Sequence, residues 1–396
     1  MKHLLITQQE LCNYGGSEVV TLELANQAFE AGFKVTILTN RYSPPFIDEF
    51  SDRITITADE DQITLSEISH LWIHHNYYPE KLLSRIEKTG SVGDIKIAFH
   101  HMSPYVPIES PFLPTLESSI ADYVYFNSQE TLESYNDLFA DKEKLRVFGN
   151  PAPDKFDFTK KPTDSLSNIL VVSNHVPEEL RIALKEMKNV KVRYIGESDQ
   201  VTLVQPSDIE AADVVVSIGK TVQYSMLSAT PVYCYDHFGG PGYITLKNYK
   251  KAKSYNFSGR GYSKKSPADI KKELIEQFAF ASKQAQAIKH EYIDGIKLSN
   301  ALNEFLNAKS KKKTLSIRAS DIHKARIQSQ LNRTVVQSFG YYKEQIQNKD
   351  SQLEFERTKN TKLKDQYKDV KHRYENTIEY QAKRVAKKIL KSIKVI

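Results

Sequence analysis

The most constraining part of the sequence is the stretch from Asp213 to Tyr243, which reads DVVVSIGKTVQYSMLSATPVYCYDHFGGPGY. Its apolar run over residues 214–216 is typical of a strand that is buried on both faces. A short helix is expected over 222–228, followed by a second strand over 232–235 and a glycine-rich loop. Strand, helix and strand in this order predict half of a doubly wound sheet, in which ligands bind at the carboxyl ends of the strands.

The turn between the first strand and the helix is a candidate anion site. A helix that begins after Gly219 offers unpaired backbone N–H groups and the positive end of its dipole to an anion. Lys220 adds a charge beside these groups, and Thr221 follows it in the first turn. We therefore predict phosphate binding at these three residues; the alternative is an ordinary strand–helix unit with a surface lysine.

Strand and helix patterns alternate along most of the chain. This alternation predicts parallel sheets that are covered by helices on both faces. We expect an N-terminal domain at residues 1–150 and a second domain at 151–310, which ends in a helical region starting at Pro267 with Ser266 as its N-cap. Strands are expected at residues 3–7, 34–39, 70–73, 95–99, 123–126, 145–148, 169–173, 191–195, 201–204, 214–216 and 232–235.

Residues 311–396 differ in character from the two domains and predict a helical extension. Glycine and proline nearly vanish, and Lys, Gln and Glu dominate. Tyr367, Val370 and Tyr374 fall at helical spacing, but Asn360 and Gln381 interrupt the apolar seam. We expect a long polar helix, with a coiled coil as the alternative and with self-association or a partner helix over residues 340–380.

The end of the extension, residues 381–396, predicts contact with a membrane. It contains six lysines and arginines and no acid, so it accounts for the whole net charge of +6. Aliphatic residues alternate with these cations, as in basic amphipathic helices that bind anionic membrane surfaces. The remaining chain is neutral and has no basic groove, which argues against nucleic acid as a partner.

The cysteine content and the absence of long apolar runs predict a cytoplasmic protein. Cys12 and Cys234 fit no metal-ligand spacing, and free thiols suit a reducing compartment. Met1 leads directly into a short strand, without the pattern of a signal peptide. No run approaches the roughly 18 apolar residues that span a bilayer. With the basic end, this predicts peripheral association with the inner face of the plasma membrane.

Six short motifs follow one another along the first 305 residues. The first is GGSE (15–18), which is followed by a helix and by the strand entry AGFKV. The other five are, in chain order, LWIHHN (71–76), AFHH (98–101), ADYVYFNS (121–128), VFGNP (147–151) and ATPV (229–232). Together they resemble the family 4 glycosyltransferases. The resemblance implies the GT-B architecture, in which two Rossmann-like doubly wound α/β domains face each other across a cleft.

The resemblance also implies roles for particular residues. The second domain would bind the nucleotide sugar and the first domain the acceptor. Gly15 and Gly16 would let the backbone approach the donor phosphates or the acceptor closely, and His100 or His101 would position the sugar or stabilise charge in the transition state; His74 and His75 are weaker candidates. The loop residues expected to contact the sugar or the ribose are Asp236, His237, Gly239 and Gly240.

The chain departs from the family pattern at positions that usually hold charged residues. Val216 and Tyr224 occupy the positions of two glutamates that the family usually carries, and the usual Arg and Lys pair of the second domain is missing. Lys220 and Arg260 are expected to supply positive charge instead. No carboxylate lies at ligand spacing from the histidine pairs, so we expect neither a metal nor a cofactor; the acidic residues 59–61 are taken as solvated surface.

The sequence therefore predicts a hexosyl- or deoxyhexosyltransferase. It would move a sugar from a nucleotide-sugar donor to a lipid-linked or cell-surface polysaccharide acceptor, with retention of configuration and without a metal. The alternative is a catalytically silent GT-B-like subunit that scaffolds a polysaccharide biosynthesis complex. Loss of the glutamate pair favours the silent subunit, while the GG turn, Lys220 and the 236–242 loop favour the enzyme.

Overall fold

A computed structural model describes residues 1–196, 202–308, 315 and 317–393. Its contacts divide the chain into two units, Met1–Val336 and Gln337–Ile396, and we describe each unit by itself. The helices are α1 (Gly16–Glu30), α2 (Glu80–Thr89), α3 (Pro114–Ile120), α4 (Gln129–Tyr135), α5 (Glu178–Lys185), α6 (Pro206–Ala211), α7 (Lys220–Leu227), α8 (Tyr249–Ser254), α9 (Pro267–Glu276), α10 (Phe278–Ile296), α11 (Leu298–Asn307), α12 (Ala319–Glu375) and α13 (Ile378–Ile393).

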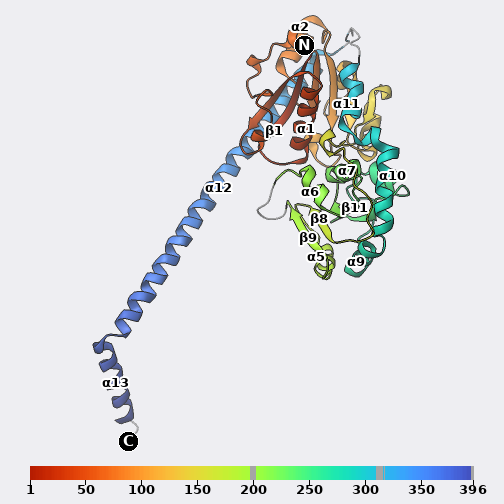
Figure 1. Ribbon diagram of the computed structural model, residues 1–396. Coiled ribbons are helices and arrows are strands. Elements are labelled where there is room, and N and C mark those ends of the chain that lie inside the picture. The colour runs from red at the N-terminus through yellow and green to blue at the C-terminus, as the bar shows by residue number, and fades with distance from the viewer. Residues whose placement is uncertain (197–201, 309–314, 316, 394–396) are drawn as a thin grey trace. The chain divides into compact units, whose positions relative to one another are not determined.

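The first unit contains two sheets, which confirms the predicted α/β class with two doubly wound domains (Figure 1). The first sheet has seven parallel strands in the order β3-β2-β1-β4-β5-β6-β7. Its order reverses direction between β1 and β4, the kind of point at which ligands bind in open doubly wound sheets. The strands are β1 (His3–Leu11), β2 (Lys34–Tyr42), β3 (Thr55–Thr57), β4 (His70–His74), β5 (Lys96–His101), β6 (Tyr123–Phe126) and β7 (Leu145–Val147).

The second sheet has five strands in the order β12-β11-β10-β8-β9. Four strands are parallel, and β12 pairs antiparallel with β11. The fully buried run of β10 lies in the middle of the sheet, as its continuous valines predict. The strands are β8 (Asn168–Val172), β9 (Lys191–Ile195), β10 (Val214–Ser217), β11 (Val232–Asp236) and β12 (Gly239–Tyr243).

The end of the second domain packs against the first domain. The apolar residues of α11 belong to the core on one face of the N-terminal sheet. Phe305 is fully buried there, with its ring centroid 5.3 Å from those of His70 and Trp72. The predicted helical region after Pro267 is thus three helices, and Ser266 caps the first of them by accepting a hydrogen bond of 3.1 Å from the Asp269 amide.

The first turns of α12 also belong to the N-terminal domain. Ile322 and Ala325 are buried in the core on the other face of the N-terminal sheet. Arg326 forms ion pairs of 2.8 and 2.7 Å with Glu80 and Glu87 of α2. The predicted extension from residue 311 therefore begins as part of the compact unit, and the division between the units falls after Val336.

Two local predictions differ from the structure. Residues 202–204 form no strand, and Val201 lies outside the described residues. The predicted glycine-rich loop is largely the strand β12, because Gly239 pairs with Asp236 in a tight antiparallel hairpin. The chain between the two sheets is packed at Ala152, whose backbone forms hydrogen bonds with Ile296 and Leu298 at the junction of α10 and α11.

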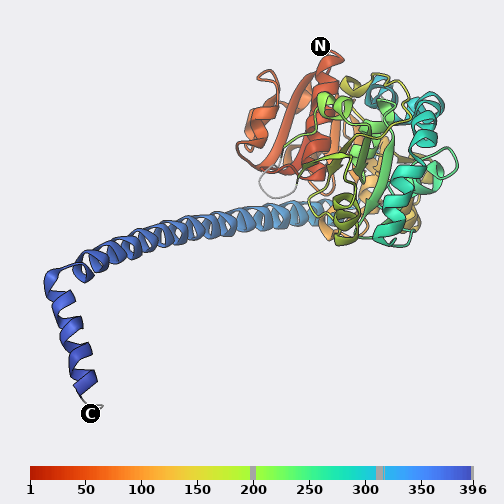
Figure 2. The ribbon, with the colours of Figure 1, turned by 60° about the horizontal axis from the view of Figure 1, so that its bottom comes forward.

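The second unit consists of the rest of α12 and of α13. Figure 2 shows α12 as one long, gently curved helix. Within the described residues, no helix has the length and apolar character needed to cross a membrane. The predicted membrane-binding stretch 381–396 falls on α13, but residues 394–396 and the side chains from residue 389 onward lie outside what the structure describes.

Candidate functional site

A cavity of about 430 Å³ lies at the carboxyl ends of the strands of the second sheet. Residues from the ends of β8, β9, β10 and β11 line one side, and the first turn of α1 lines the other. The doubly wound topology places these strand ends together, as expected for a ligand crevice. Of the predicted site residues, the cavity brings together Gly15, Gly16, Lys220, Thr221, Asp236 and His237.

Helix α7 begins at this cavity without a side-chain cap. Gly219 is the N-cap residue and has a φ of +60°, a conformation that strongly favours glycine. Its amide donates a hydrogen bond of 2.9 Å to the Phe257 carbonyl, which holds the turn in place. The first N–H groups of α7 and the positive end of its dipole therefore remain suited to binding an anion.

Lys220 is held by the opposite domain. Its ammonium group lies 2.5 Å from the Glu23 carboxylate of α1 and donates a hydrogen bond of 3.1 Å to the Pro151 carbonyl. The Tyr224 hydroxyl, one turn along α7, donates to the same carboxylate. Burial raises the pKa of Glu23, and Lys220 opposes this shift. The pair is nearly desolvated, with side chains 15% and 10% exposed, so removing either partner would leave a costly buried charge.

Helix α1 also starts without a side-chain cap, at Gly15. The Glu18 carboxylate folds back over Gly15, since a Cβ atom there would lie 2.4 Å from a Glu18 oxygen. A Cβ atom at Gly16 would meet no atom of the protein within 4 Å, although Gly16 lines the cavity. Packing against other parts of the protein therefore does not account for a glycine at position 16, and the space beside it is open.

The hairpin after β11 contributes only its first two residues to the cavity. The buried carboxylate of Asp236 accepts a hydrogen bond of 2.7 Å from the His237 amide, and the His237 ring is exposed. Gly239 and Gly240 do not line the cavity. A Cβ atom on either would lie within 2.4 Å of a backbone oxygen, so the close packing of β12 accounts for both glycines.

The structure does not bring Arg260 to the cavity. Its guanidinium group forms a bidentate pair with Glu130 of α4, at 3.0 Å from Nε and 2.5 Å from one terminal nitrogen. The same group lies over the rings of Tyr105 and Phe238, at 5.0 and 5.8 Å from their centroids. Arg260 thus joins the two domains through a charge-assisted pair.

His100 and His101 end β5 as predicted, but both side chains are fully buried and neither lines the cavity. His101 is anchored by Nε2, 2.8 Å from the Glu117 carboxylate, and by Nδ1, 3.2 Å from the Glu109 carbonyl. The His100 ring packs 5.5 Å from that of Trp72 and 5.3 Å from that of Phe148.

Together with His74 and His75, His100 forms a group of buried neutral histidines. Burial lowers the pKa of His74 to about 3, and it lowers the pKa of His75 and His100 well below the usual value. The imidazole rings of His74 and His100 lie 5.3 Å apart. In the described part of the chain, no group of three or more His, Cys, Asp or Glu side chains has a geometry that could hold a metal ion.

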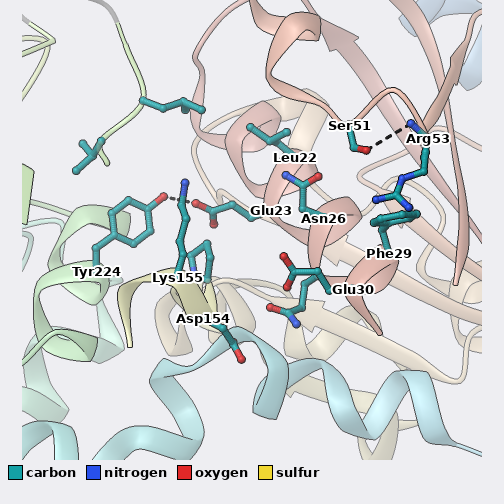
Figure 3. A pocket seen from close by; sticks show the side chains of 14 residues that line it. Leu22, Glu23, Asn26, Phe29, Glu30, Ser51, Arg53, Asp154, Lys155 and Tyr224 are labelled. Atoms are coloured by element: carbon teal, nitrogen blue, oxygen red, sulfur yellow. Dashed lines mark hydrogen bonds between the residues drawn. The ribbon is translucent and has the colours of Figure 1, made fainter. Parts of the chain in front are cut away.

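A second cavity, of about 370 Å³, lies next to the first and shares Leu203, Val204 and Tyr224 with it. Figure 3 shows Glu23 and Tyr224 at one end and Arg53 over the ring of Phe29 at the other. Acidic, basic and amide side chains alternate around it, so its wall offers both hydrogen-bond donors and acceptors. Tyr224 thus lines both cavities, and its partner Glu23 lines the second.

Sequence reasoning missed Glu23. It lies in the middle of an apparently ordinary amphipathic helix, and no local pattern distinguishes it from Glu30. Its buried partner Tyr224 stands at a position where the family that the sequence resembles usually carries a glutamate. A phenol at that position is the one signal that could have prompted a search for a carboxylate elsewhere.

No family model matches the sequence, and no curated protein matches it either. Solved structures with a similar fold include HepE from Anabaena in complex with UDP and glucose, at 14% identity, a TM-score of 0.48 and coverage of 78% of this chain and 100% of HepE. A glycosyltransferase from Rickettsia africae has 14% identity, a TM-score of 0.46 and coverage of 77% and 97%. A mutant of S. aureus TarM has 9% identity, a TM-score of 0.48 and coverage of 78% and 99%.

The buried histidines predict that the protein loses stability in mild acid. His100 takes up a proton in the unfolded chain near pH 6.5 but stays neutral when folded, so unfolding binds a proton below that pH. Between pH 7.5 and pH 5 this histidine alone should lower the free energy of unfolding by about 2 kcal/mol. The variant His100→Phe, measured by urea denaturation at both pH values, should lose correspondingly less stability than the wild type.

The control is His290→Gln, which removes an exposed histidine of α10 and should keep the wild-type pH dependence. If His100→Phe loses as much stability between the two pH values as the wild type does, then His100 does not contribute to the acid sensitivity.

Proposed function

We propose that the chain is a glycosyltransferase that moves a sugar from a nucleotide-sugar donor to a glycan or lipid-linked acceptor. The observation that carries this proposal is the cavity that gathers two uncapped helix starts, two glycines and Lys220 at the carboxyl ends of a doubly wound sheet. Helix starts bind phosphate groups through backbone N–H donors and the helix dipole. The resemblance of the sequence to the family 4 glycosyltransferases gives the same assignment independently.

In this proposal the donor diphosphate binds at the start of α7. The N–H groups of the first turn and the Lys220 ammonium would stabilise the negative charge that develops on the leaving group. Lys220 would exchange part of its contact with Glu23 for the phosphate. Asp236 and His237 lie at the same strand edge, where a sugar or ribose hydroxyl could be bound.

The proposed reaction retains configuration and uses no metal. Same-face attack, in which the leaving phosphate accepts the proton of the acceptor, requires little from protein bases. This suits a cavity whose described lining includes the carboxylate of Asp236 and no other, with Glu23 paired to Lys220 outside that lining. The proposed donor sugar is a hexose or deoxyhexose, and the acceptor belongs to a lipid-linked or cell-surface polysaccharide.

Lys220→Ala should weaken binding of nucleoside diphosphates. Loss of one charge-assisted hydrogen bond to phosphate should reduce the binding free energy by roughly 1.5–3 kcal/mol. Isothermal titration calorimetry with a panel of nucleoside diphosphates measures this change. Lys283→Ala, which removes an exposed lysine of α10, serves as the control and should bind like the wild type.

The same titrations in EDTA test the proposed independence of metal. Nucleotide affinity and transfer should be unchanged by chelation. Activity that EDTA abolishes and that Mg²⁺ or Mn²⁺ restores would contradict the proposal on this point.

Gly16→Ala should weaken nucleotide binding without destabilising the protein. The added methyl group would meet no other part of the protein within 4 Å at a residue that lines the cavity, and alanine favours a helix interior over glycine by about 1 kcal/mol. The melting temperature should therefore stay the same or rise, while nucleotide affinity falls. Gly240→Ala is the opposite control, because its methyl group would collide with the Cys234 carbonyl and unfold the protein. Unchanged affinity in Gly16→Ala would exclude close ligand contact at this residue.

A second candidate function is supported by the ion pair between Lys220 and Glu23. If this pair is permanent, Lys220 cannot bind phosphate, and the chain would be a catalytically silent subunit of a polysaccharide biosynthesis complex. Failure of the wild type to bind any nucleoside diphosphate in the calorimetric panel would favour this candidate.

We further propose that the protein is cytoplasmic and binds peripherally to the inner face of the plasma membrane through residues 381–396. Lys383, Arg384, Lys387 and Lys388 lie on α13 together with Val385 and other aliphatic residues. Such a helix lies in the membrane interface with its cations toward anionic headgroups. Membrane docking would hold the chain at the surface that carries a lipid-linked acceptor.

A chain cut after Tyr380 should stop binding anionic vesicles but keep its melting temperature and nucleotide affinity. Each cation near an anionic surface contributes about 1 kcal/mol, and the attraction decays over a Debye length of roughly 8 Å. Sedimentation with vesicles of phosphatidylserine and phosphatidylcholine measures binding, which should weaken as salt increases. Replacement of the four cations at 383–388 by glutamine is the matched variant; vesicle binding by the truncated chain would contradict the proposal.

A further inference from the structure

The second cavity, of about 370 Å³, has no role in the proposed binding of the donor. Its described walls come mainly from α1 between Leu22 and Glu30, from Ser51 and Arg53 ahead of β3, and from the segment 153–155 between the two sheets. None of its described lining residues belongs to a strand, whereas strands of the second sheet end at the first cavity. The second cavity is therefore a separate candidate site beside α1.

One face of α1 lines this cavity with polar side chains (Figure 3). Three- and four-residue spacings bring side chains to the same face of a helix, and here they connect Glu23, Asn26, Gln27 and Glu30. The amides of Asn26 and Gln27 are half-buried, and neither forms a side-chain hydrogen bond with the part of the protein that the structure describes. Both amides thus have free donors and acceptors at the cavity.

The charges around the cavity do not favour a phosphate group. The Arg53 guanidinium lies over the Phe29 ring, 4.6 Å from its centroid, and Lys155 is the other cation of the described lining. Against these two cations, the described lining contains the carboxylates of Glu23, Glu30 and Asp154. The lining therefore has no excess of positive charge that would attract an anion, in contrast to the start of α7.

A neutral ligand rich in hydroxyl groups fits this wall. A hydroxyl group both donates and accepts hydrogen bonds, so neighbouring hydroxyls can use amide, carboxylate and guanidinium groups at the same time. Leu22, Pro153 and Leu203 add apolar surface for C–H groups of the ligand. The volume of about 370 Å³ lies within the range of small-molecule sites, which is roughly 300–1,000 Å³. A small saccharide combines these properties.

Glu23 connects the second cavity to the first. One of its carboxylate oxygens accepts a hydrogen bond from the Tyr224 hydroxyl, and the other lies 2.5 Å from the Lys220 ammonium. Each oxygen can accept a further hydrogen bond, and Glu23 lines the second cavity. A saccharide hydroxyl that donates to Glu23 would compensate part of its negative charge and so weaken its hold on Lys220. Lys220 would then be more available to a phosphate in the first cavity.

We propose that the second cavity binds a neutral saccharide, and that this saccharide raises the affinity of the first cavity for a nucleoside diphosphate through Glu23 and Lys220. The saccharide site rests on the cavity wall alone, whereas the coupling also rests on the proposed function of Lys220. Coupling between two binding sites is reciprocal, so the nucleotide raises the affinity for the saccharide by the same factor.

Titration of the full chain with methyl glycosides, followed by NMR, tests the saccharide site. The probes are the methyl glycosides of glucose, galactose, N-acetylglucosamine and rhamnose, at up to tens of millimolar, and at least one of them should bind. Asn26→Leu, which keeps the side-chain volume but removes its hydrogen bonds, should weaken this binding about 5-fold or more. Arg53→Met changes an exposed residue and should weaken it similarly.

Asn300→Leu is the matched control, because it removes an exposed asparagine of α11 outside the cavity lining and should bind like the wild type. Melting temperatures show that each variant is folded. Absence of binding by every glycoside would overturn the proposal. Binding that is equally strong in the wild type, Asn26→Leu and Arg53→Met would overturn it as well, because the saccharide would then lie elsewhere.

Calorimetry with the panel of nucleoside diphosphates tests the coupling. When the glycoside is saturating, the dissociation constant of the nucleotide should fall about 5-fold or more, the lower end of typical coupling between sites. Lys220 lies outside the described lining of the second cavity, so Lys220→Ala should still bind the glycoside. In this variant, however, the glycoside should no longer change the affinity for the nucleotide.

The two titrations separate this inference from the proposed function. A wild type that binds nucleotide but no glycoside would overturn the inference and leave the proposed function intact. A wild type that binds glycoside but no nucleoside diphosphate would contradict the proposed function and the coupling, while the saccharide site would stand. Equal nucleotide affinity with and without bound glycoside would overturn the coupling.

Discussion

The ion pair between Lys220 and Glu23 is the interaction on which the candidate site depends. A lysine at the first position of α7 adds positive charge where the helix dipole is already positive, which is unfavourable without an anion. Glu23 provides that anion from the other domain, and Tyr224 donates to the same carboxylate. Because all three side chains are largely buried, the contact holds α1 against α7 at the place where Tyr224 lines both cavities.

The contact is supported by the chain between the domains. The ring of Phe156 stacks on Tyr224 at 4.2 Å between centroids, and Lys220 donates to the carbonyl of Pro151. The segment that joins the two sheets is therefore part of the site's scaffold. The packing of α11 on the N-terminal core adds a second connection, so the two domains contact each other both at the cavity and through α11.

The buried histidines illustrate how a residue type can mislead. Histidines at the ends of β4 and β5 occupy strand ends where catalytic groups are expected in doubly wound folds. The surrounding aromatic rings of Trp72 and Phe148 make this end of the sheet a core, and the pKa of His74 and His100 falls because a charged ring would be desolvated there.

Much of the architecture was predictable because it depends on local patterns. Continuous apolar runs identified the buried strands, alternation identified the parallel sheets, and Gly219 followed by Lys220 identified the helix start at the cavity. The strand β12 was missed, because its glycines resemble those of a loop. Only the tertiary structure shows that the backbone at Cys234 and Ser263 lies too close to these glycines for a side chain to fit. The helix α11 was predicted, but its packing on the other domain was not.

By itself, the sequence determined which segments form strands and helices, where α7 begins and which residues are charged, because these depend on neighbours along the chain. Only the tertiary structure decided which charged side chains form ion pairs with each other. Lys220 and Arg260 are both cations in glycine-rich surroundings, yet only Lys220 lines the cavity, while Arg260 pairs with Glu130. The physical reason is that a buried charge must find its counter-charge in space, and Glu23 and Glu130 are both more than a hundred residues away from their partners along the chain.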